Sequence, residues 1–112
     1  MHLHIYYCNC FVTVEPVIHP LSIVQYVNTT ATLSCESTAR GNIRYQWRRV
    51  NGEISSDRAN GVNTSTLTIS PVTEQDEDEY YCMATYAIVN GTLHNVTSNK
   101  AKITVYGEEW MM

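Results

Sequence analysis

Hydrophobic and polar residues alternate along several short stretches of this chain. In residues 31–35 the small or apolar side chains take every second position, with threonine and serine between them. Residues 43–48 and 100–106 repeat the pattern, and the short stretch 67–69 lies between them. A period of two residues is typical of a β-strand with one buried face. We therefore expect an all-β chain built from half-buried strands.

Turn and edge signals separate these stretches. Asn-Gly pairs at positions 51–52 and 90–91 are typical of tight hairpin turns. Pro16 and Pro20 flank the start of a β-prone part of the chain that continues through residues 23–27. Proline is tolerated best at the edge of a sheet, because it has no backbone N–H to donate. This part of the chain is therefore expected to form edge strands.

Five short motifs occur in the order and at the spacing of a known family. They are Leu33-Ser34-Cys35, Trp47, Leu67-Thr68-Ile69, Asp76 and Tyr80-Tyr81-Cys82. In these motifs, residues 16–106 resemble an immunoglobulin-like domain. The resemblance implies an all-β, antiparallel β-sandwich of seven or eight strands.

The resemblance also implies which residues are structural. A disulfide between Cys35 and Cys82 would join the two sheets and pack against Trp47. Tyr80 would be the corner tyrosine, whose hydroxyl binds backbone a few residues upstream. The implied core consists of Leu33, Trp47, Leu67, Ile69 and Tyr80. The sequence departs from the family at Asp78, where a small residue is usual.

The segment between Trp47 and Leu67 limits the type of domain. Residues 48–66 are too few for the two extra strands of a variable-type domain. The resemblance is therefore to the intermediate or constant-like set. Within this segment Arg58 has two open interpretations: an ion pair with Asp76, as the family often has, or a solvated arginine.

Cysteine use bears on the compartment. A chain of 112 residues is one domain, and a domain of this size buries only about two-thirds of its unfolded surface. The implied disulfide would therefore matter for stability, and it needs an oxidising compartment. The alternative is a pair of reduced, buried cysteines, as in intracellular immunoglobulin domains of muscle type.

Glycosylation sequons favour the secretory pathway. The N-x-[ST] pattern begins at Asn28, Asn63, Asn90 and Asn95. All four lie in predicted turns or strand ends, as expected of a glycosylated extracellular domain. The alternative is that asparagine and threonine simply favour turns.

The two ends of the chain fall outside the predicted domain, which spans residues 16–106. We expect residues 1–15 to be a linker or the remnant of a preceding region, and residues 107–112 to be a tail. The start lacks the basic residues and cleavage site of a signal peptide, and no apolar run of about 18 residues could span a membrane. We expect a piece of a longer secretory product, whose signal or membrane anchor lies outside this chain.

Two groups of metal-binding residue types have simpler interpretations. His2, His4, Cys8 and Cys10 lack the usual spacing of zinc ligands. Cys8 and Cys10 are also too close for an unstrained bridge, so free thiols or disulfides to other segments or chains are expected. Residues 74–79 are mostly acidic but lack a calcium-loop pattern, and we interpret them as a solvated corner loop. We expect no metal or cofactor.

Catalysis and nucleic-acid binding are not indicated by the sequence. His19 and His94 lie far apart, and the chain has neither a nucleophile elbow nor a phosphate-binding glycine loop. The net charge of −4 argues against a nucleic-acid partner. We expect a protein that is not an enzyme and has no small-molecule substrate.

Three binding functions remain open. The chain would be an ectodomain module of a cell-surface receptor or adhesion protein, with a homophilic or heterophilic protein partner. Alternatively, it would be a secreted immune-type recognition domain that uses its loops, or a passive spacer in a multi-domain ectodomain. The fold alone does not decide between them.

The two-residue period predicts a partner-binding face. With Trp47 and Cys82 inward, the residues between point outward from three strands that the family places side by side. The outward set is Arg44, Gln46, Arg48, Tyr81, Met83, Thr85, Lys100, Lys102, Thr104 and Tyr106. It contains residue types enriched at interfaces, and its positive charge would attract an acidic partner. The alternative is ordinary exposed surface.

The sequons are expected to avoid this face. The family topology would cluster Asn63, Asn90 and Asn95 near the loop end that follows Cys35, and would put Asn28 at the opposite end. Glycans there would obstruct the loop tips and leave the sheet face open.

Overall fold

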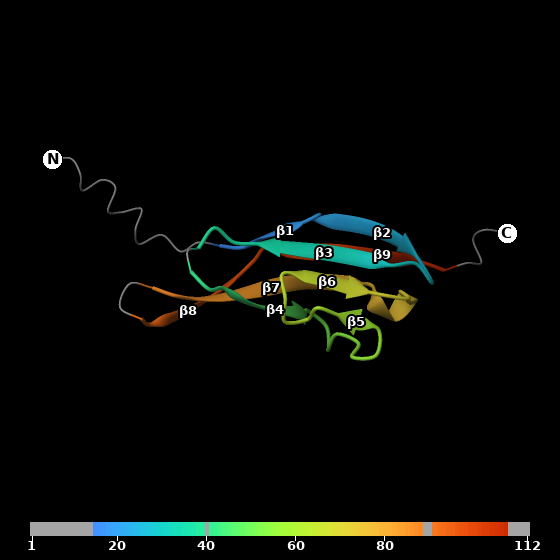
Figure 1. Ribbon diagram of the computed structural model, residues 1–112. Coiled ribbons are helices and arrows are strands. Elements are labelled where there is room, and N and C mark those ends of the chain that lie inside the picture. Colours follow the sequence, from blue (N-terminus) through green and yellow to red (C-terminus); the bar gives the residue numbers. More distant parts are fainter. Residues whose placement is uncertain (1–14, 40, 89–90, 108–112) are drawn as a thin grey trace.

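The computed structural model describes residues 15–39, 41–88 and 91–107, which form two packed layers of strands (Figure 1). The described elements are β1 (Val17–His19), β2 (Ser22–Tyr26), β3 (Ala31–Glu36), β4 (Arg44–Arg49), β5 (Ala59–Asn60), β6 (Thr66–Ile69), the 3-10 helix η1 (Glu74–Asp76), β7 (Asp78–Ala87), β8 (Leu93–Thr97) and β9 (Ala101–Tyr106). The predicted all-β sandwich is confirmed.

One layer is a four-stranded sheet in the order β1-β3-β6-β5. The other is a five-stranded sheet in the order β2-β9-β7-β4, in which β8 also pairs with β7. Two strands are interrupted: β1 and β2 are separated at Pro20, and β8 and β9 are separated at residues 98–100. With each interrupted strand counted once, the nine described segments make seven strands, in agreement with the prediction.

The first strand changes sheets. β1 pairs antiparallel with β3, whereas β2 pairs in parallel with β9. Pro20, which cannot donate to either ladder, lies in the short break between them. The prediction that residues 16–27 form edge strands is correct, because β1 and β2 each end their sheet. The parallel pairing with β9 was not predicted.

The core lies between the sheets. The five residues predicted for it, Leu33, Trp47, Leu67, Ile69 and Tyr80, have at most 2% of their surface exposed. The Cys35–Cys82 disulfide joins β3 to β7 across this core. The indole Nε1 of Trp47 donates a 2.9 Å hydrogen bond to the carbonyl oxygen of Thr64. This bond satisfies the one polar atom that the large ring would otherwise bury unpaired.

Arg58 and Asp76 form a buried ion pair. Arg58 binds both carboxylate oxygens of Asp76, which is 1% exposed. The solvated interpretation of Arg58 is therefore wrong. Burial acts to raise the pKa of Asp76, but its hydrogen bonds with Arg58 and Thr73 outweigh burial and hold that pKa below its ordinary value.

The departure from the family at Asp78 has a structural explanation. Its carboxylate accepts hydrogen bonds from Arg49 Nε at 2.8 Å and from the backbone and side chain of Asn51, both at 3.0 Å. Burial acts to raise the pKa of Asp78, and these partners lower it overall. The interpretation of residues 74–79 as a solvated loop is thus wrong for Asp76 and Asp78, whose side chains are 1% and 4% exposed.

β4 ends the five-stranded sheet in the part of the chain that the structure describes. Between β4 and β6 there is only the two-residue strand β5, which belongs to the other sheet. The expected lack of extra variable-type strands is confirmed for residues 50–65. Among the described residues, no helix has the length and apolar character needed to cross a bilayer.

Candidate protein-binding face

The outer face of the five-stranded sheet is the candidate site. We define the outer face as the outward side chains of β2, β4, β7, β8 and β9, together with Lys100. The register of β4 on β7 places Arg48 opposite Tyr81 and Gln46 opposite Met83. These are outward positions, because Trp47 opposite Cys82 lies in the core.

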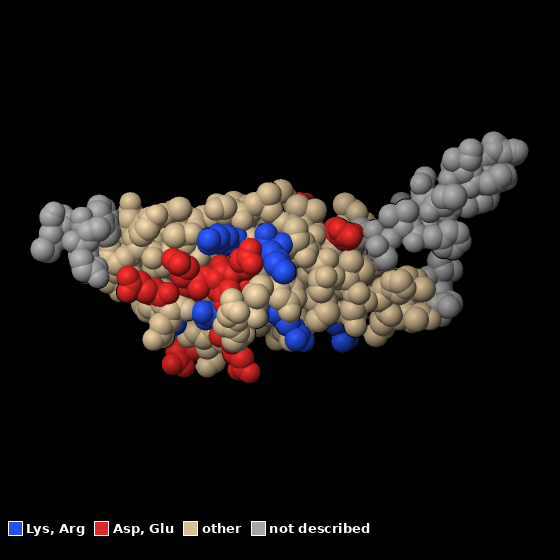
Figure 2. All heavy atoms as spheres, turned by 180° about the vertical axis from the view of Figure 1, so that it is seen from behind, with Lys and Arg blue, Asp and Glu red and all other residues tan. Residues whose placement is uncertain are grey.

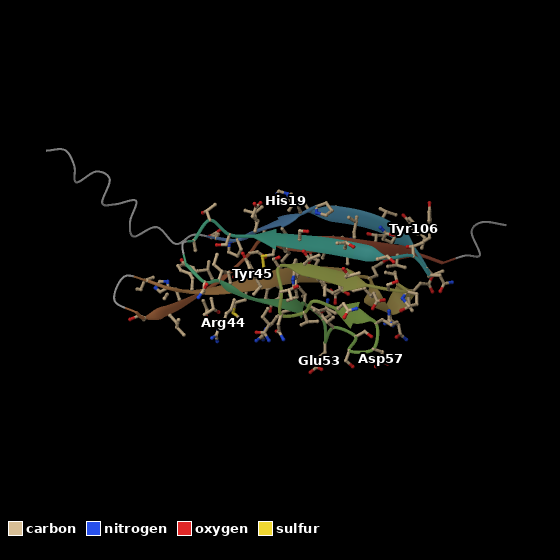
Figure 3. The ribbon with its side chains drawn as sticks, in the orientation of Figure 1. His19, Arg44, Tyr45, Glu53, Asp57 and Tyr106 are labelled. Carbon is tan, nitrogen blue, oxygen red and sulfur yellow. A yellow bond between two sulfur atoms is a disulfide. The ribbon has the colours of Figure 1, made fainter. Side chains whose placement is uncertain are left out.

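Side-chain directions follow the predicted alternation. In Figure 3, Arg44 projects away from the molecule and the neighbouring Tyr45 lies between the layers. Arg44, Gln46, Arg48, Lys100, Lys102 and Tyr106 are exposed, whereas Tyr81 and Met83 are half-buried. The half-buried pair belongs to β7, the central strand, whose neighbours on both sides cover part of each side chain. The predicted residues therefore share one face.

The charge of this face is more mixed than the sequence indicated. Glu79 is exposed and stands opposite Lys102 in the register of β7 and β9. Figure 2, seen from behind, shows acidic side chains close to the lysine and arginine groups. Glu79 was missed, although it lies two residues before Tyr81 and the same period points it outward. Arg44, Arg48, Lys100 and Lys102 still outnumber it on the outer face.

Polar contacts orient two parts of the outer face. Arg48 Nη2 donates a 3.1 Å hydrogen bond to Gln46 Oε1 along β4. Thr85 Oγ1 donates a 2.6 Å hydrogen bond to Asn95 Oδ1, from β7 to β8. The rings of Tyr26 and Tyr106 lie 6.0 Å apart at the far end of the face.

A shallow hollow continues the outer face past the edge of β4. It is lined in part by Gln46, Arg48, Glu53, Ile54, Val62 and Tyr81. Glu53, in the loop after β4, is one of the lining residues, and its side chain projects away from the molecule (Figure 3). The hollow thus combines the aromatic ring of Tyr81 with two basic side chains, Arg48 and Arg49, and one acidic side chain, Glu53. This mixture suits a polypeptide surface rather than a small molecule.

One sequon lies on the outer face, contrary to expectation. Asn95 is exposed and pairs with Thr85, which in turn stands opposite Arg44. The prediction that all sequons avoid the face is therefore wrong for Asn95. The error arises because the last hairpin is paired as far as Ala87 and Leu93, so Asn95 belongs to a strand and not to a loop.

Of the remaining sequons, Asn28 lies away from the outer face, Asn63 lies at its border, and Asn90 lies outside the described residues. Asn28 is exposed in a turn, with a positive φ of 71°. Asn63 is exposed and lines a second hollow beside β4, together with the outer-face residues Arg44, Gln46 and Thr85.

The metal interpretation is tested for only part of the chain. Within residues 15–39, 41–88 and 91–107, no group of three or more His, Cys, Asp or Glu side chains is arranged to hold a metal ion. His2, His4, Cys8 and Cys10 lie outside the described residues. In the acidic run, Glu77 Oε1 accepts a 2.9 Å hydrogen bond from the backbone N–H of Val105, so this carboxylate too is bound within the fold.

Comparisons with known proteins agree with the architecture. The family described as immunoglobulin domain matches residues 15–85. No curated protein sequence matches this chain. The fold recurs in 1213 solved chains, so it does not by itself identify a partner.

One similar solved chain comes from a study entitled "Structural basis of T cell specificity and activation by the bacterial superantigen toxic shock syndrome toxin-1". The two chains superimpose with a TM-score of 0.66 over 83% of this chain and 99% of the other, at 19% identity. At that identity the similarity shows the fold alone.

Proposed function

Because this chain belongs to the immunoglobulin domain family, we propose that it is a non-catalytic, extracellular protein-binding module of a cell-surface receptor or adhesion protein. Domains of this family generally bind other molecules and carry out no chemistry. The Cys35–Cys82 disulfide supports an extracellular location, since such bonds persist in oxidising compartments.

The observation that carries this proposal is the pairing of Arg48 with Tyr81 and of Gln46 with Met83 on the outer face. Arginine, tyrosine and methionine are enriched where proteins bind each other. Here they stand on neighbouring strands of a rigid sheet, beside the hollow at the edge of β4. A preformed surface loses little conformational freedom on binding, which favours affinity.

The charge on this face favours a partner with acidic groups. Among the described residues, the outer face carries four basic side chains, Arg44, Arg48, Lys100 and Lys102, and one carboxylate, that of Glu79. Complementary charge speeds encounter and selects among partners. A nucleic acid is not proposed, because the chain is acidic overall and these four basic residues form no broad basic surface.

Asn95 limits where that partner docks. A glycan on Asn95 would stand on the outer face beside Thr85, close to the Arg44 end of β4. The half formed by β2 and β9, together with the Arg48–Tyr81 pair, would remain open. We propose glycosylation at Asn28, Asn63 and Asn95, and at Asn90 outside the described residues.

Substitutions on the outer face test the proposal. The domain, produced in a secretory system, is applied to cells that display candidate ectodomains, and bound protein is measured. Arg48→Glu and Tyr81→Ala should each reduce binding by about tenfold or more, as truncation of an interface anchor does. Thr32→Glu, on the exposed side of β3 in the other sheet, is the matched control and should bind normally.

The glycan is tested separately. Asn95→Gln and Thr97→Ala both destroy the sequon by different chemistry, so an equal effect of the two on binding identifies the glycan as its cause. Increased binding in both means that the glycan shields the partner site. Unchanged binding in Arg48→Glu and Tyr81→Ala would contradict the sheet-face proposal.

A second candidate is recognition by the tip of the β7–β8 hairpin. Leu93 is 65% exposed and Ile88 is 37% exposed near this tip, and exposed apolar side chains at a loop are suited to binding. Leu93→Ser and Ile88→Ser would then abolish binding while Arg48→Glu has no effect. Absence of specific binding in the unsubstituted domain would favour the passive spacer.

A further inference from the structure

Among the described strands, β2 ends its sheet, and no strand pairs with its second edge at Ser22 or Val24. Its other edge pairs with β9, where Leu21 accepts from the N–H of Lys102 and Val27 donates to the carbonyl of Tyr106, both at 2.9 Å. Backbone groups in a strand alternate sides. The N–H and C=O groups of Ser22 and Val24 therefore point away from β9, at the end of the sheet.

Within β2 itself, Ser22–Tyr26, this edge lacks two of the features that keep sheet edges from pairing. Charged side chains, prolines and covering loops are the usual ones. The opposite edge of the same sheet has them: β4 carries three arginines, and the N–H of Trp47 is occupied by the carbonyl of Val62 at 2.8 Å. The five residues of β2 include neither a charged residue nor a proline. Two of its outward side chains, Val24 and Tyr26, are 55% and 46% exposed.

We propose that this edge is a self-association site, at which β2 of one molecule pairs antiparallel with β2 of a second copy. An exposed strand edge is completed by another extended strand. A two-fold axis presents the same edge from both molecules, so the contact closes on itself as a dimer. With no charge within either β2 strand, the paired strands bring no like charges directly opposite each other.

The distribution of free backbone groups selects the register. A two-fold axis at Ile23 sets Ser22 of each molecule opposite Val24 of the other. The backbone N–H and C=O groups of both residues, which point away from β9, then form hydrogen-bonded pairs between the two molecules. Pro20, which has no N–H to donate, then faces Tyr26 of the second copy. The carbonyl of Tyr26 already accepts from the N–H and hydroxyl of Thr29, at 3.2 and 2.6 Å. Pro20, which has no N–H, thus lies opposite Tyr26, whose carbonyl oxygen already accepts hydrogen bonds from Thr29.

The consequence of this pairing is one continuous sheet through both molecules. The two outer faces would then lie side by side on the same surface, and a partner with two binding sites would bind with avidity. The self-association itself does not depend on the outer face having a partner, so either proposal can fail alone.

Association is tested on the full chain by sedimentation equilibrium from about 10 µM to about 1 mM, the range of weak contacts. The mass is expected to rise from monomer to dimer and to stop there. Amide hydrogen exchange at Ser22 and Val24 should slow as the concentration rises. A mass that stays monomeric over the whole range would overturn the proposal.

Charge substitutions test the register. Ser22→Lys with Val24→Lys places like charges opposite each other twice, and should raise the dissociation constant by about tenfold or more. Ser22→Glu with Val24→Lys places opposite charges together in this register only, and should restore the dimer. Val17→Lys, at an exposed position of β1 in the other sheet, is the control. Dimerisation unaffected by the double lysine variant would exclude the β2 edge.

Discussion

The hydroxyl group of Tyr80 donates a 2.6 Å hydrogen bond to the backbone carbonyl oxygen of Asp76. Tyr80 is fully buried on β7, and Asp76 ends the 3-10 helix η1. The bond therefore holds the turn against the strand that carries Cys82. The carboxylate of the same Asp76 binds Arg58, so one buried residue connects Tyr80 and the segment before β5.

Tyr80→Phe should lower the free energy of unfolding by about 1–2 kcal/mol. The substitution keeps the ring but leaves the buried carbonyl of Asp76 without this donor. Denaturant unfolding measures the change. Tyr106→Phe, at a half-exposed ring on the outer face, is the matched control and should change stability by less than about 0.5 kcal/mol. Lost partner binding with unchanged stability would show that Tyr80 is a ligand residue.

Alkaline pH should destabilise the protein through Tyr80. Burial raises the pKa of Tyr80 to about 12, from 10.0. Between these values the unfolded tyrosine has lost its proton and the folded one retains it, so stability falls as pH rises. The loss should approach about 2–3 kcal/mol near pH 12. Unfolding of the wild type and of Tyr80→Phe from pH 9 to 12 measures it, and equal slopes would contradict this assignment.

Arg58→Ala should lower stability by about 3 kcal/mol or more, because it leaves the buried carboxylate of Asp76 without its cation. The pKa of Asp76 is lowered in the fold. Its stabilising contribution is therefore present above the unfolded pKa and is lost as pH falls through the folded one. Acid unfolding below about pH 4 should show a shallower pH dependence in Arg58→Ala. If the stability of Arg58→Ala depends on acid pH as steeply as that of the wild type, the Arg58–Asp76 ion pair does not control unfolding in acid.

Trp47 should show a graded response. Trp47→Ala should cost about 3–5 kcal/mol, as for a large core truncation. Trp47→Phe retains an aromatic ring but loses the hydrogen bond to Thr64, so its cost should be smaller. Equal costs for the two variants, measured by thermal and denaturant unfolding, would mean that the ring itself contributes little packing energy.

Gly61→Ala should be among the most destabilising small substitutions. A Cβ at Gly61 would lie 2.0 Å from the carbonyl oxygen of Thr66, and the residue has a φ of +80°. Gly52 also has a positive φ, of +112°, but nothing lies within 4 Å of a Cβ there. Gly52→Ala should cost about 1–3 kcal/mol for the backbone alone, and Gly61→Ala clearly more. Similar losses of stability in the two variants would show that the loop around Gly61 shifts to accommodate the added Cβ.

The predictable part of this fold follows from local patterns. The alternation around Cys35, Trp47 and Cys82 sets which side chains face inward, and the structure buries all three. The proline positions correctly indicated edge strands. These features depend on a two-residue period and on the missing N–H of proline, both of which are readable without knowledge of the partner strand.

The unpredicted part depends on which strands pair and in which register. The outward position of Asn95 follows from its pairing with Thr85, and an isolated stretch of sequence does not specify that pairing. Asp78, with Arg49 and Asn51, forms a cluster from residues far apart in the chain. Glu79 is different: the same period that pointed Tyr81 outward was sufficient to place it.

The parallel pairing of β2 with β9 has a mechanical consequence. The described ends of the chain, residues 15 and 107, lie at opposite ends of the molecule (Figure 1), and both strands run in the same direction. Tension between these ends would pull β2 and β9 past each other along their length. The hydrogen bonds from Leu21 to Val27 would then share the load together instead of opening one by one. The strand that changes sheets thus makes the domain resist a force that is applied between residues 15 and 107.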